Sequence, residues 1–299
     1  MKLALWRWIA LPSLLLAGGQ SIPQPFQISV DVNLVLVHPA VRDSKDHFVS
    51  DLRETDFSVF EDGVPQQIRL FRHEDVPVTI GLVIDHSGSM QRKMPEVIIA
   101  ARSFVQSSND KDQMFVVNFN ERASFGLPKG REFSNRAEDL EAAIQRAPVA
   151  GQTALYDAVA LALTKLAAGR PDKKVLVIVS DGGDNTSTLK LPELLKRTGH
   201  SDALIYAIGI FDADEKDRNP GVLQRLARGS GGDAFFPEKP GEVIEICERI
   251  ARDIRNQYTL GYVPTNHAAA WRNVKVTARQ ANKPKLVVRA RTGYFPTQP

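Results

Sequence analysis

The spacing of hydrophobic and polar residues predicts an α/β region in the middle of the chain. Between Pro77 and Arg255, short apolar runs rich in β-branched residues alternate with segments whose apolar residues recur every three or four positions. Nearly continuous apolar runs are typical of strands buried on both faces of a parallel sheet. The predicted strands are residues 78–84, 114–119, 175–179 and 203–210. The predicted helices are residues 95–107, 136–146, 155–168, 191–198, 222–228 and 241–255. This alternation predicts a doubly wound, mostly parallel sheet with helices on both faces.

The residues on either side of this region follow the two-residue rhythm of β-strands. Residues 26–37 alternate in this way, and residues 57–71 predict a hairpin whose two strands are joined at Asp62-Gly63. Asp-Gly favours a type I′ turn, because both central residues of that turn need a positive φ. After the α/β region, β patterns return in residues 258–262, 274–278 and 286–291.

We therefore expect a leader, an α/β domain and two β-rich flanks. The expected bounds are 1–19 for the leader, 20–77 for the first flank, 78–257 for the α/β domain and 258–299 for the second flank. The flanks hold 58 and 42 residues, each small for a core of its own, and together they match a β-sandwich of about 100 residues. We expect one β-sandwich-like domain with the α/β domain inserted in it. Two independent β appendages remain the alternative.

The leader has the residue order of a secretory signal. Lys2 and Arg7 accompany an apolar stretch, residues 3–16, and small residues follow it. We expect cleavage near Gly19 or Ser21, and a secreted or periplasmic protein with no membrane span after cleavage. The alternative is a retained membrane anchor, for which the stretch is shorter than the roughly 20 residues that a spanning helix needs.

Charge and cysteine content narrow the function classes. Of the 38 Lys and Arg residues, two lie in the leader, which leaves 36 against 35 Asp and Glu residues. Near neutrality and dispersed basic residues argue against a nucleic-acid-binding protein. The single cysteine, Cys247, allows no intrachain disulfide and lies in an apolar pattern that predicts a buried side chain.

The sequence VIDHSGSM, residues 83–90, places three chemically distinctive residue types directly after the first strand. Asp85, His86 and Ser87 suggest a hydrolase triad, but a triad needs its His between Ser and Asp, and consecutive residues in a turn diverge. No G-x-S-x-G sequence occurs either. Asp and Ser also cap turns and helices. This sequence alone therefore leaves a metal site and a capped turn open.

Two further loops bring oxygen ligands to the same edge of the predicted sheet. Thr153 lies just before a predicted helix, and Asp181 follows the strand at residues 175–179. Ligands of parallel sheets bind at the carboxyl ends of the strands, so we expect the three loops to form one site. Two carboxylates and three hydroxyls fit Mg²⁺, or Mn²⁺ or Ca²⁺, whereas Zn²⁺ favours His and Cys. The expected metal ligands are Asp85, Ser87, Ser89, Thr153 and Asp181.

These residues resemble a known adhesion site. D-x-S-x-S after an apolar strand, a downstream Gly-x-Thr, and Ser-Asp-Gly after another strand resemble the metal-ion-dependent adhesion site (MIDAS) of the von Willebrand factor type A (VWFA) domain. The resemblance covers the α/β region and implies a Rossmann-like fold. The flanking sequences FSVFEDG and RTGYF resemble those of secreted bacterial VWFA-related proteins of the acidobacterial type.

The resemblance also implies a role for each ligand. Ser87 and Ser89 would bind the ion through their hydroxyls, Thr153 would bind it directly in the ligand-bound state, and Asp85 and Asp181 would hold it directly or through water. A Glu or Asp carboxylate of a partner protein would complete the coordination.

We expect the neighbouring polar residues to be structural. His86 is expected to face solvent, and Asp110 and Asp112 to lie in a solvated loop. For Asp184 and Asn185 we favour closure of a turn, and the alternative is that they support the metal ligands from behind.

The sequence thus predicts a cation-dependent protein-binding module rather than an enzyme. One alternative is an envelope assembly or scaffold protein with a structural metal. Another is a hydrolase, which needs a positioned base near an activated water. Only Asp184 and His86 lie near enough to be that base, and nothing in the sequence fixes the position of either side chain.

Overall fold

The computed structural model describes residues 34–211, 218–239, 241–266, 270–281 and 285–296. The predicted leader lies outside the described residues. Of the strand predicted at residues 26–37, only the end is described, as β1 (Val35–Val37).

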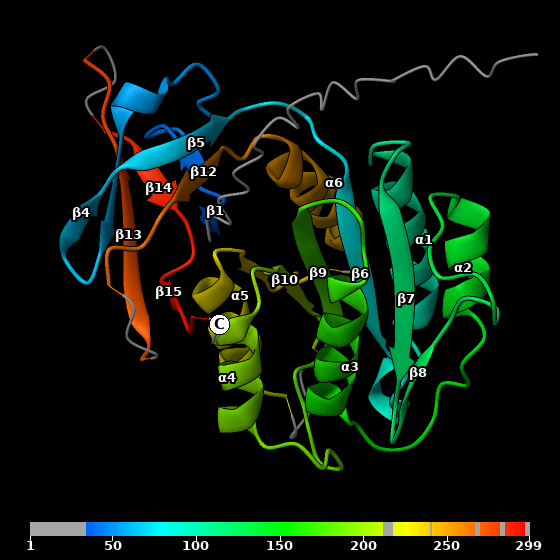
Figure 1. The fold of residues 1–299 in the computed structure, drawn as a ribbon. Helices are drawn as coiled ribbons and strands as arrows, with labels where there is room; N and C mark the ends of the chain where they lie inside the picture. The colour runs from blue at the N-terminus through cyan, green and yellow to red at the C-terminus, as the bar shows by residue number, and fades with distance from the viewer. Residues whose placement is uncertain (1–33, 212–217, 240, 267–269, 282–284, 297–299) are drawn as a thin grey trace, which may run out of the picture. The chain divides into compact units, whose positions relative to one another are not determined.

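The α/β region forms a six-stranded sheet in the order β11-β10-β9-β6-β7-β8, with helices on both faces (Figure 1). Its strands are β6 (Val78–Asp85), β7 (Gln113–Phe119), β8 (Ala123–Phe125), β9 (Lys173–Ser180), β10 (Leu204–Gly209) and β11 (Ala234–Phe235). Its helices are α1 (Met94–Gln106), α2 (Ala137–Ile144), α3 (Leu155–Ala167), α4 (Leu191–His200), α5 (Pro220–Ser230) and α6 (Glu242–Arg255). All neighbouring pairs are parallel except β7 with the edge strand β8, so the predicted fold class is confirmed.

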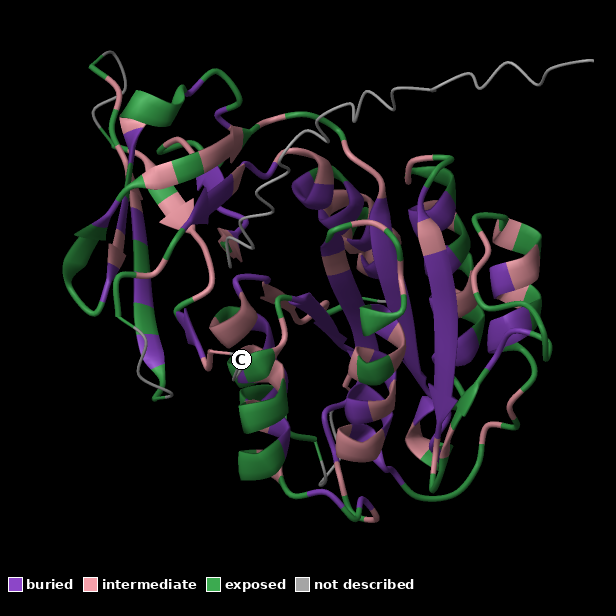
Figure 2. Ribbon diagram, viewed as in Figure 1, coloured by how far each residue is buried: buried purple, intermediate pink, exposed green. Residues whose placement is uncertain are grey.

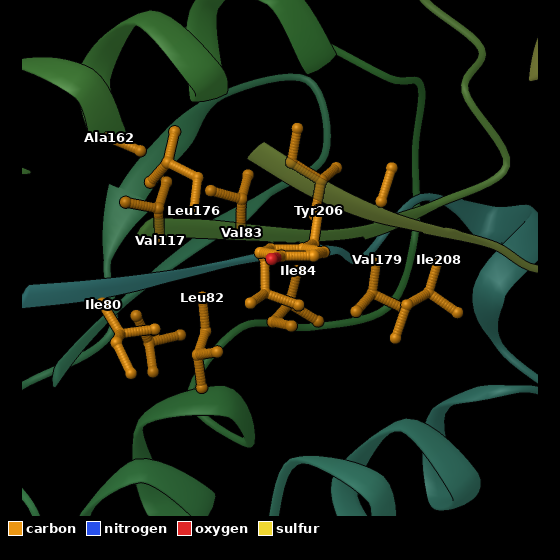
Figure 3. Close-up of a cluster of buried hydrophobic side chains, with 14 of the residues drawn as sticks. Ile80, Leu82, Val83, Ile84, Val117, Ala162, Leu176, Val179, Tyr206 and Ile208 are labelled. Atoms are coloured by element: carbon orange, nitrogen blue, oxygen red, sulfur yellow. The ribbon is translucent and has the colours of Figure 1, made fainter. Parts of the chain in front are cut away.

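The sheet is buried on both faces, as the unbroken apolar runs predict (Figure 2). Every residue of β6 is buried. Figure 3 shows Val83 and Leu176 on one face of the sheet and Ile80 and Leu82 on the other. Burial on both faces fixes the register of β6, so the residues that follow its carboxyl end are held in place.

Strands before and after the α/β region pair with one another in antiparallel sheets. β1 pairs with β12 (Thr259–Tyr262), and β12 pairs with β5 (Ile68–Arg72). β3 (Phe57–Glu61) pairs with β13 (Arg272–Ala278), which also pairs with β15 (Gly293–Tyr294). β2 (Ala40–Arg42) pairs with β14 (Val287–Arg289). A core separate from that of the α/β sheet contains residues of both flanks, among them Val59, Tyr258 and Val276.

The predicted hairpin is right at its turn and wrong at its second strand. Asp62 and Gly63 have φ values of 49° and 83°, as the type I′ turn requires. The hairpin partner of β3 is the short strand β4 (Val64–Gln66), whereas β5, with Ile68 and Leu70, pairs with β12. β4 is an edge strand that contains Pro65, which lacks a backbone donor, and this position suits a chain that then moves to another sheet.

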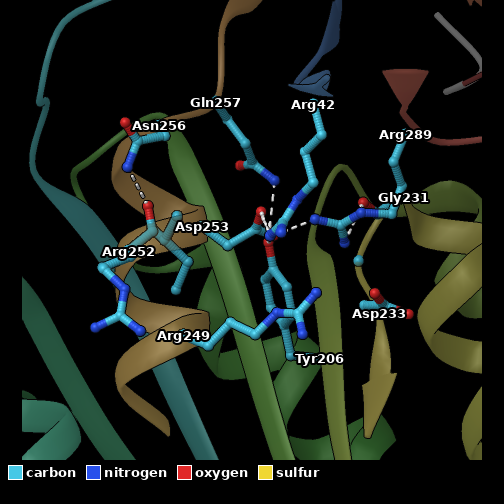
Figure 4. A network of polar contacts seen from close by, with 12 residues as sticks. Arg42, Tyr206, Gly231, Asp233, Arg249, Arg252, Asp253, Asn256, Gln257 and Arg289 are labelled. Atoms are coloured by element: carbon cyan, nitrogen blue, oxygen red, sulfur yellow. Dashed lines mark hydrogen bonds and ion pairs between the residues drawn. The ribbon is translucent and has the colours of Figure 1, made fainter. Parts of the chain in front are cut away.

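A buried ion network joins α6 to strands of both flanks (Figure 4). Asp253 of α6 accepts hydrogen bonds from Arg42 of β2, at 3.3 Å, from Arg289 of β14, and from the hydroxyl of Tyr206 in β10. The side chain of Asp253 is only 2% exposed. Its carboxylate therefore depends on these partners for compensation of its charge.

Candidate metal centre

The candidate site lies at the carboxyl ends of β6 and β9. β6 is bordered by β9 on one side and β7 on the other. The strands that follow β6 are therefore added first on one side of it and then on the other, and this makes β6 the switch point of the strand order. Crevices at such switch points are the usual ligand sites of open α/β sheets. Ile84 pairs with Val179, and this register brings Asp85 beside the residues that end β9.

Four of the five predicted ligands form one hydrogen-bonded group. The carboxylate Oδ1 of Asp85 accepts a hydrogen bond from the backbone N–H of Ser87 at 2.8 Å. The hydroxyls of Ser87 and Ser89 lie 3.0 Å apart, and Ser89 donates to Asp181 Oδ2 at 2.6 Å. A 3₁₀ turn, Gly88–Met90, makes this approach possible because it folds the chain back directly after Ser87.

The fifth predicted ligand, Thr153, lies in a loop bound to both of the other loops. The carbonyl of Gly151 accepts a hydrogen bond from Gly88 N at 3.1 Å. Thr153 N donates to Asn185 Oδ1 at 2.9 Å, and Thr153 O accepts from Asn185 N at 3.0 Å. In the part of the chain that the structure describes, the Thr153 hydroxyl makes no hydrogen bond to the other four ligands.

Ser180 is a site residue that the sequence reasoning missed. Its hydroxyl donates to Asp85 Oδ2 at 2.6 Å and accepts a hydrogen bond from Gly182 N at 3.0 Å. Gly183 N donates to Asp181 Oδ1 at 2.9 Å, so the loop after β9 orients both carboxylates. The sequence signal for Ser180 was its position as the last residue of a strand, directly before Asp181.

The two carboxylates of the site are buried. Asp85 is fully buried and Asp181 is 3% exposed. Burial raises the pKa of Asp85 to about 6, hydrogen bonds from Ser180 and Ser87 oppose that rise, and the charge of Asp181 adds to it. Among the described residues, no Lys or Arg side chain forms an ion pair with either carboxylate. Two buried carboxylates without a counter-charge are costly, and a divalent cation would compensate both.

The donor set fits a hard ion. No group of three or more His, Cys, Asp or Glu side chains suited to a metal occurs among the described residues. An ion held here would have the serine and threonine hydroxyls available beside the two carboxylates, which is the oxygen chemistry of Mg²⁺, Mn²⁺ and Ca²⁺.

The prediction that His86 faces solvent is wrong. His86 is 1% exposed, and its ring nitrogens lie 3.1 Å from Ile84 O and 2.9 Å from Ile144 O. Burial lowers its pKa, against the effect of these two carbonyls. The contact of the ring with Ile144, the last residue of α2, spans 58 residues, and such a long-range contact has no local sequence signal.

Two of the other expectations for nearby polar residues need correction or extension. Asp184 closes a turn by accepting from Ser187 Oγ at 2.6 Å, and it also accepts from Tyr156 N at the start of α3. Asp112 is buried rather than solvated. It accepts from Val78 N at 2.8 Å and pairs with Arg255 of α6 at 2.5 Å.

The thiol of Cys247 is buried, as predicted, and burial raises its pKa to about 12.

Within the described ranges, no helix has the length and apolarity needed to cross a bilayer.

Comparisons with known proteins agree with this architecture. The sequence profile of the von Willebrand factor type A domain matches residues 79–248. A von Willebrand factor type A structure from Catenulispora acidiphila is similar with a TM-score of 0.54 at 15% identity, over 90% of this chain and 75% of that one. The vWF domain of the type V pilus tip protein Mfa5 from Porphyromonas gingivalis is similar with a TM-score of 0.51 at 13% identity, over 60% of this chain and 95% of that one.

An uncharacterized Synechocystis protein, sll0103, is 26% identical over 187 residues. That match covers 60% of this chain and 42% of the relative, so the chain spans less than half the length of the curated relative it matches. The profile match includes β6 from its second residue, the loops of the candidate site and the first half of α6, and it extends over more than half of the sequence. The chain therefore belongs to the von Willebrand factor type A domain family.

Proposed function

We propose that this chain is a secreted or periplasmic adhesion-type module that binds a partner protein through a divalent cation. Mg²⁺, or Mn²⁺ or Ca²⁺ in its place, would be held by Asp85, Ser87, Ser89, Thr153 and Asp181. VWFA domains, including those of pilus proteins, are protein-interaction modules, which supports the general class. A signal-like leader supports export.

One observation carries the metal proposal. Two buried carboxylates, Asp85 and Asp181, share a hydrogen-bonded group with two serine hydroxyls and have no cationic side chain as a partner among the described residues. Two carboxylates and a few neutral hydroxyls leave coordination positions of a hard cation to water or to an incoming oxygen ligand. A Glu or Asp carboxylate of the partner protein would fill such a position.

We propose binding without catalysis. A serine hydrolase needs a His that accepts the proton of the Ser. Both ring nitrogens of His86 face backbone carbonyls, of Ile84 and Ile144, so neither is directed to Ser87. Asp184 accepts hydrogen bonds from Tyr156 N at the start of α3 and from Ser187 Oγ, which supports a structural role for its carboxylate.

Thermal melting with metals tests the proposal. A ligand that binds only the folded state at about 100 times its Kd stabilises by about 2.7 kcal/mol. For a domain of this size we expect Mg²⁺ or Mn²⁺ to raise the melting temperature by about 5–10 °C over EDTA. Asp181→Asn should abolish that rise. Asp110→Asn, an exposed carboxylate outside the site, should keep it.

The carboxylate step has its own readout. Acetate added to the Mn²⁺ complex should displace a metal-bound water and lower the proton relaxation that the ion causes. No metal-dependent rise in melting temperature would refute the cation site. A rise with no acetate effect would refute carboxylate recognition and favour the scaffold function with a structural metal.

A further inference from the structure

A second pocket lies at the opposite edge of the central sheet from the metal centre, where its strands begin. Its wall contains Pro77, which precedes β6, and the first residues of β7 and β9, Gln113 and Lys173. Leu70 of β5 and Thr259 of β12 line it from the antiparallel sheet. Its volume of about 430 Å³ is that of a small-molecule site.

A buried histidine in this pocket lacks one hydrogen bond. His38, between β1 and β2, is 4% exposed, and its Nδ1 lies 3.1 Å from the hydroxyl of Thr259. Its Nε2 is buried and has no hydrogen-bond partner among the described residues. An unpaired polar atom of this kind is costly, so a ligand that pairs with it gains affinity.

The pocket also carries an excess of positive charge. Four cationic side chains and two carboxylates line it, namely Arg72, Lys111, Arg170 and Lys173 against Glu74 and Asp172. Arg72, Lys111 and Arg170 are exposed and form no ion pair within the described part of the chain. Burial, and then the charges of Lys173 and Arg291, lower the pKa of His38 to about 3, so its imidazole is neutral in a positive potential.

Apolar residues form the rest of the wall. Leu36, Leu70, Val76, Pro77 and Pro171 face the pocket beside the cationic residues. The pocket therefore offers matching surfaces to a ligand that has a polar head group and an apolar body. Lys173 is a weaker anchor than the arginines, because burial lowers its pKa to about 7 and its ammonium already donates to Ile254 O.

We infer that this pocket binds a small organic anion, whose carboxylate or phosphate group meets the exposed guanidinium groups of Arg72 and Arg170 and, after a small rotation of the buried ring, His38 Nε2. The body of the anion lies against Leu36 and Leu70. In the tautomer with the proton on Nε2, Nδ1 accepts from the Thr259 hydroxyl and Nε2 is the donor to the anion. Guanidinium groups suit both head groups because their paired N–H donors match carboxylate and phosphate oxygens.

Ligand-observed NMR on the full chain tests this inference with two anions, benzoate and phenyl phosphate, and with benzyl alcohol as the uncharged analogue. We expect at least one anion to bind with a Kd of about 1 mM or tighter and benzyl alcohol to bind at least about tenfold more weakly. The better anion identifies the head group.

Charge reversal supplies the matched variants. Arg72→Glu combined with Arg170→Glu should weaken anion binding at least about tenfold, whereas Arg69→Glu, exposed on the same strand as Arg72 but outside the pocket, should leave it unchanged. His38→Phe should also weaken binding, and the arginine variants decide the matter if His38→Phe does not fold. Asp181→Asn should have no effect, which separates this pocket from the metal centre.

Three results would overturn the inference. One is equal affinity for benzyl alcohol and the anions. Another is unchanged anion binding after reversal of Arg72 and Arg170. The third is no binding of either anion at about 10 mM, the weakest affinity that a built site of this size should show.

Discussion

Replacing Asp253 with asparagine tests whether the buried ion network stabilises the connection of α6 to the antiparallel sheets. The substitution keeps the size of the side chain and removes its charge. Arg42, Arg289 and the Tyr206 hydroxyl then face a neutral amide. Tyr206 is fully buried, and the side chains of Arg42 and Arg289 are 15% and 24% exposed.

The magnitude follows from this burial. Removing one partner of a fully buried ion pair costs about 3–5 kcal/mol. Both guanidinium groups retain some water and a second acceptor, since Arg42 also pairs with Asp46 at 2.9 Å and Arg289 donates to Gly231 O at 3.3 Å. We therefore expect Asp253→Asn to lower the free energy of unfolding by about 2–3 kcal/mol, below the fully buried case.

Urea unfolding followed by two probes measures the effect. Circular dichroism reports the helices, and the fluorescence of Trp271, beside β13, reports the antiparallel sheets when the other two tryptophans, Trp6 and Trp8, are replaced by phenylalanine. Glu193→Gln is the control because it removes an exposed pair with Arg197, whose side chains are 56% and 52% exposed, and should cost less than about 0.5 kcal/mol. Equal destabilisation by the two variants, or a transition of Trp271 that does not shift in Asp253→Asn, would refute the reasoning.

Three further predictions concern single residues. The thiol of Cys247, with a pKa raised to about 12 by burial, should not react with iodoacetamide at pH 8 until the chain is unfolded, and mass spectrometry would detect early alkylation. The folded-state pKa of His38, about 3, lies below its unfolded value, so its contribution to stability is present above pH 6.5 and falls by up to about 1.4 kcal/mol per unit as the pH drops toward 3. His38→Gln should flatten that part of the stability curve, and an unchanged slope would contradict the assignment. Gly232→Ala should destabilise by more than about 2 kcal/mol, since its Cβ would lie 1.9 Å from Ile205 O, whereas Gly229→Ala in α5, with open space, should be neutral or stabilising in thermal melts.

The sequence predicted the α/β sheet well because its strands are continuous apolar runs and its helices are amphipathic. Residues 155–168 and 241–255 were predicted as helices and are observed as α3 (Leu155–Ala167) and α6 (Glu242–Arg255). β8 and β11 were missed because strands of three and two residues contain too little of a period to detect. The strand exchange after Gln66 was missed because pairing partners distant in sequence leave no local pattern.

For the candidate site, the sequence indicated the edge of the sheet and the side chains, and the structure adds their environment. Loops that follow adjacent parallel strands meet, so Asp85 and Asp181 were expected together, and Ser89 is hydrogen-bonded to Asp181. The burial of His86 and the ion pair of Asp112 with Arg255 depend on contacts across 58 and 143 residues. Such contacts are tertiary, and the residue types alone predicted that both side chains would be exposed to solvent.

The pairing of β3 with β13 has a consequence for the order in which the chain folds. Val59 lies opposite Val276, and β1 lies opposite β12, so the earliest described strands wait for partners that are made only after the α/β region. Until then their free edges are open to other chains, as edge strands are in partly made proteins. The α/β region, complete before those partners emerge from the ribosome, should fold first and hold the two halves of the antiparallel sheets close enough to join.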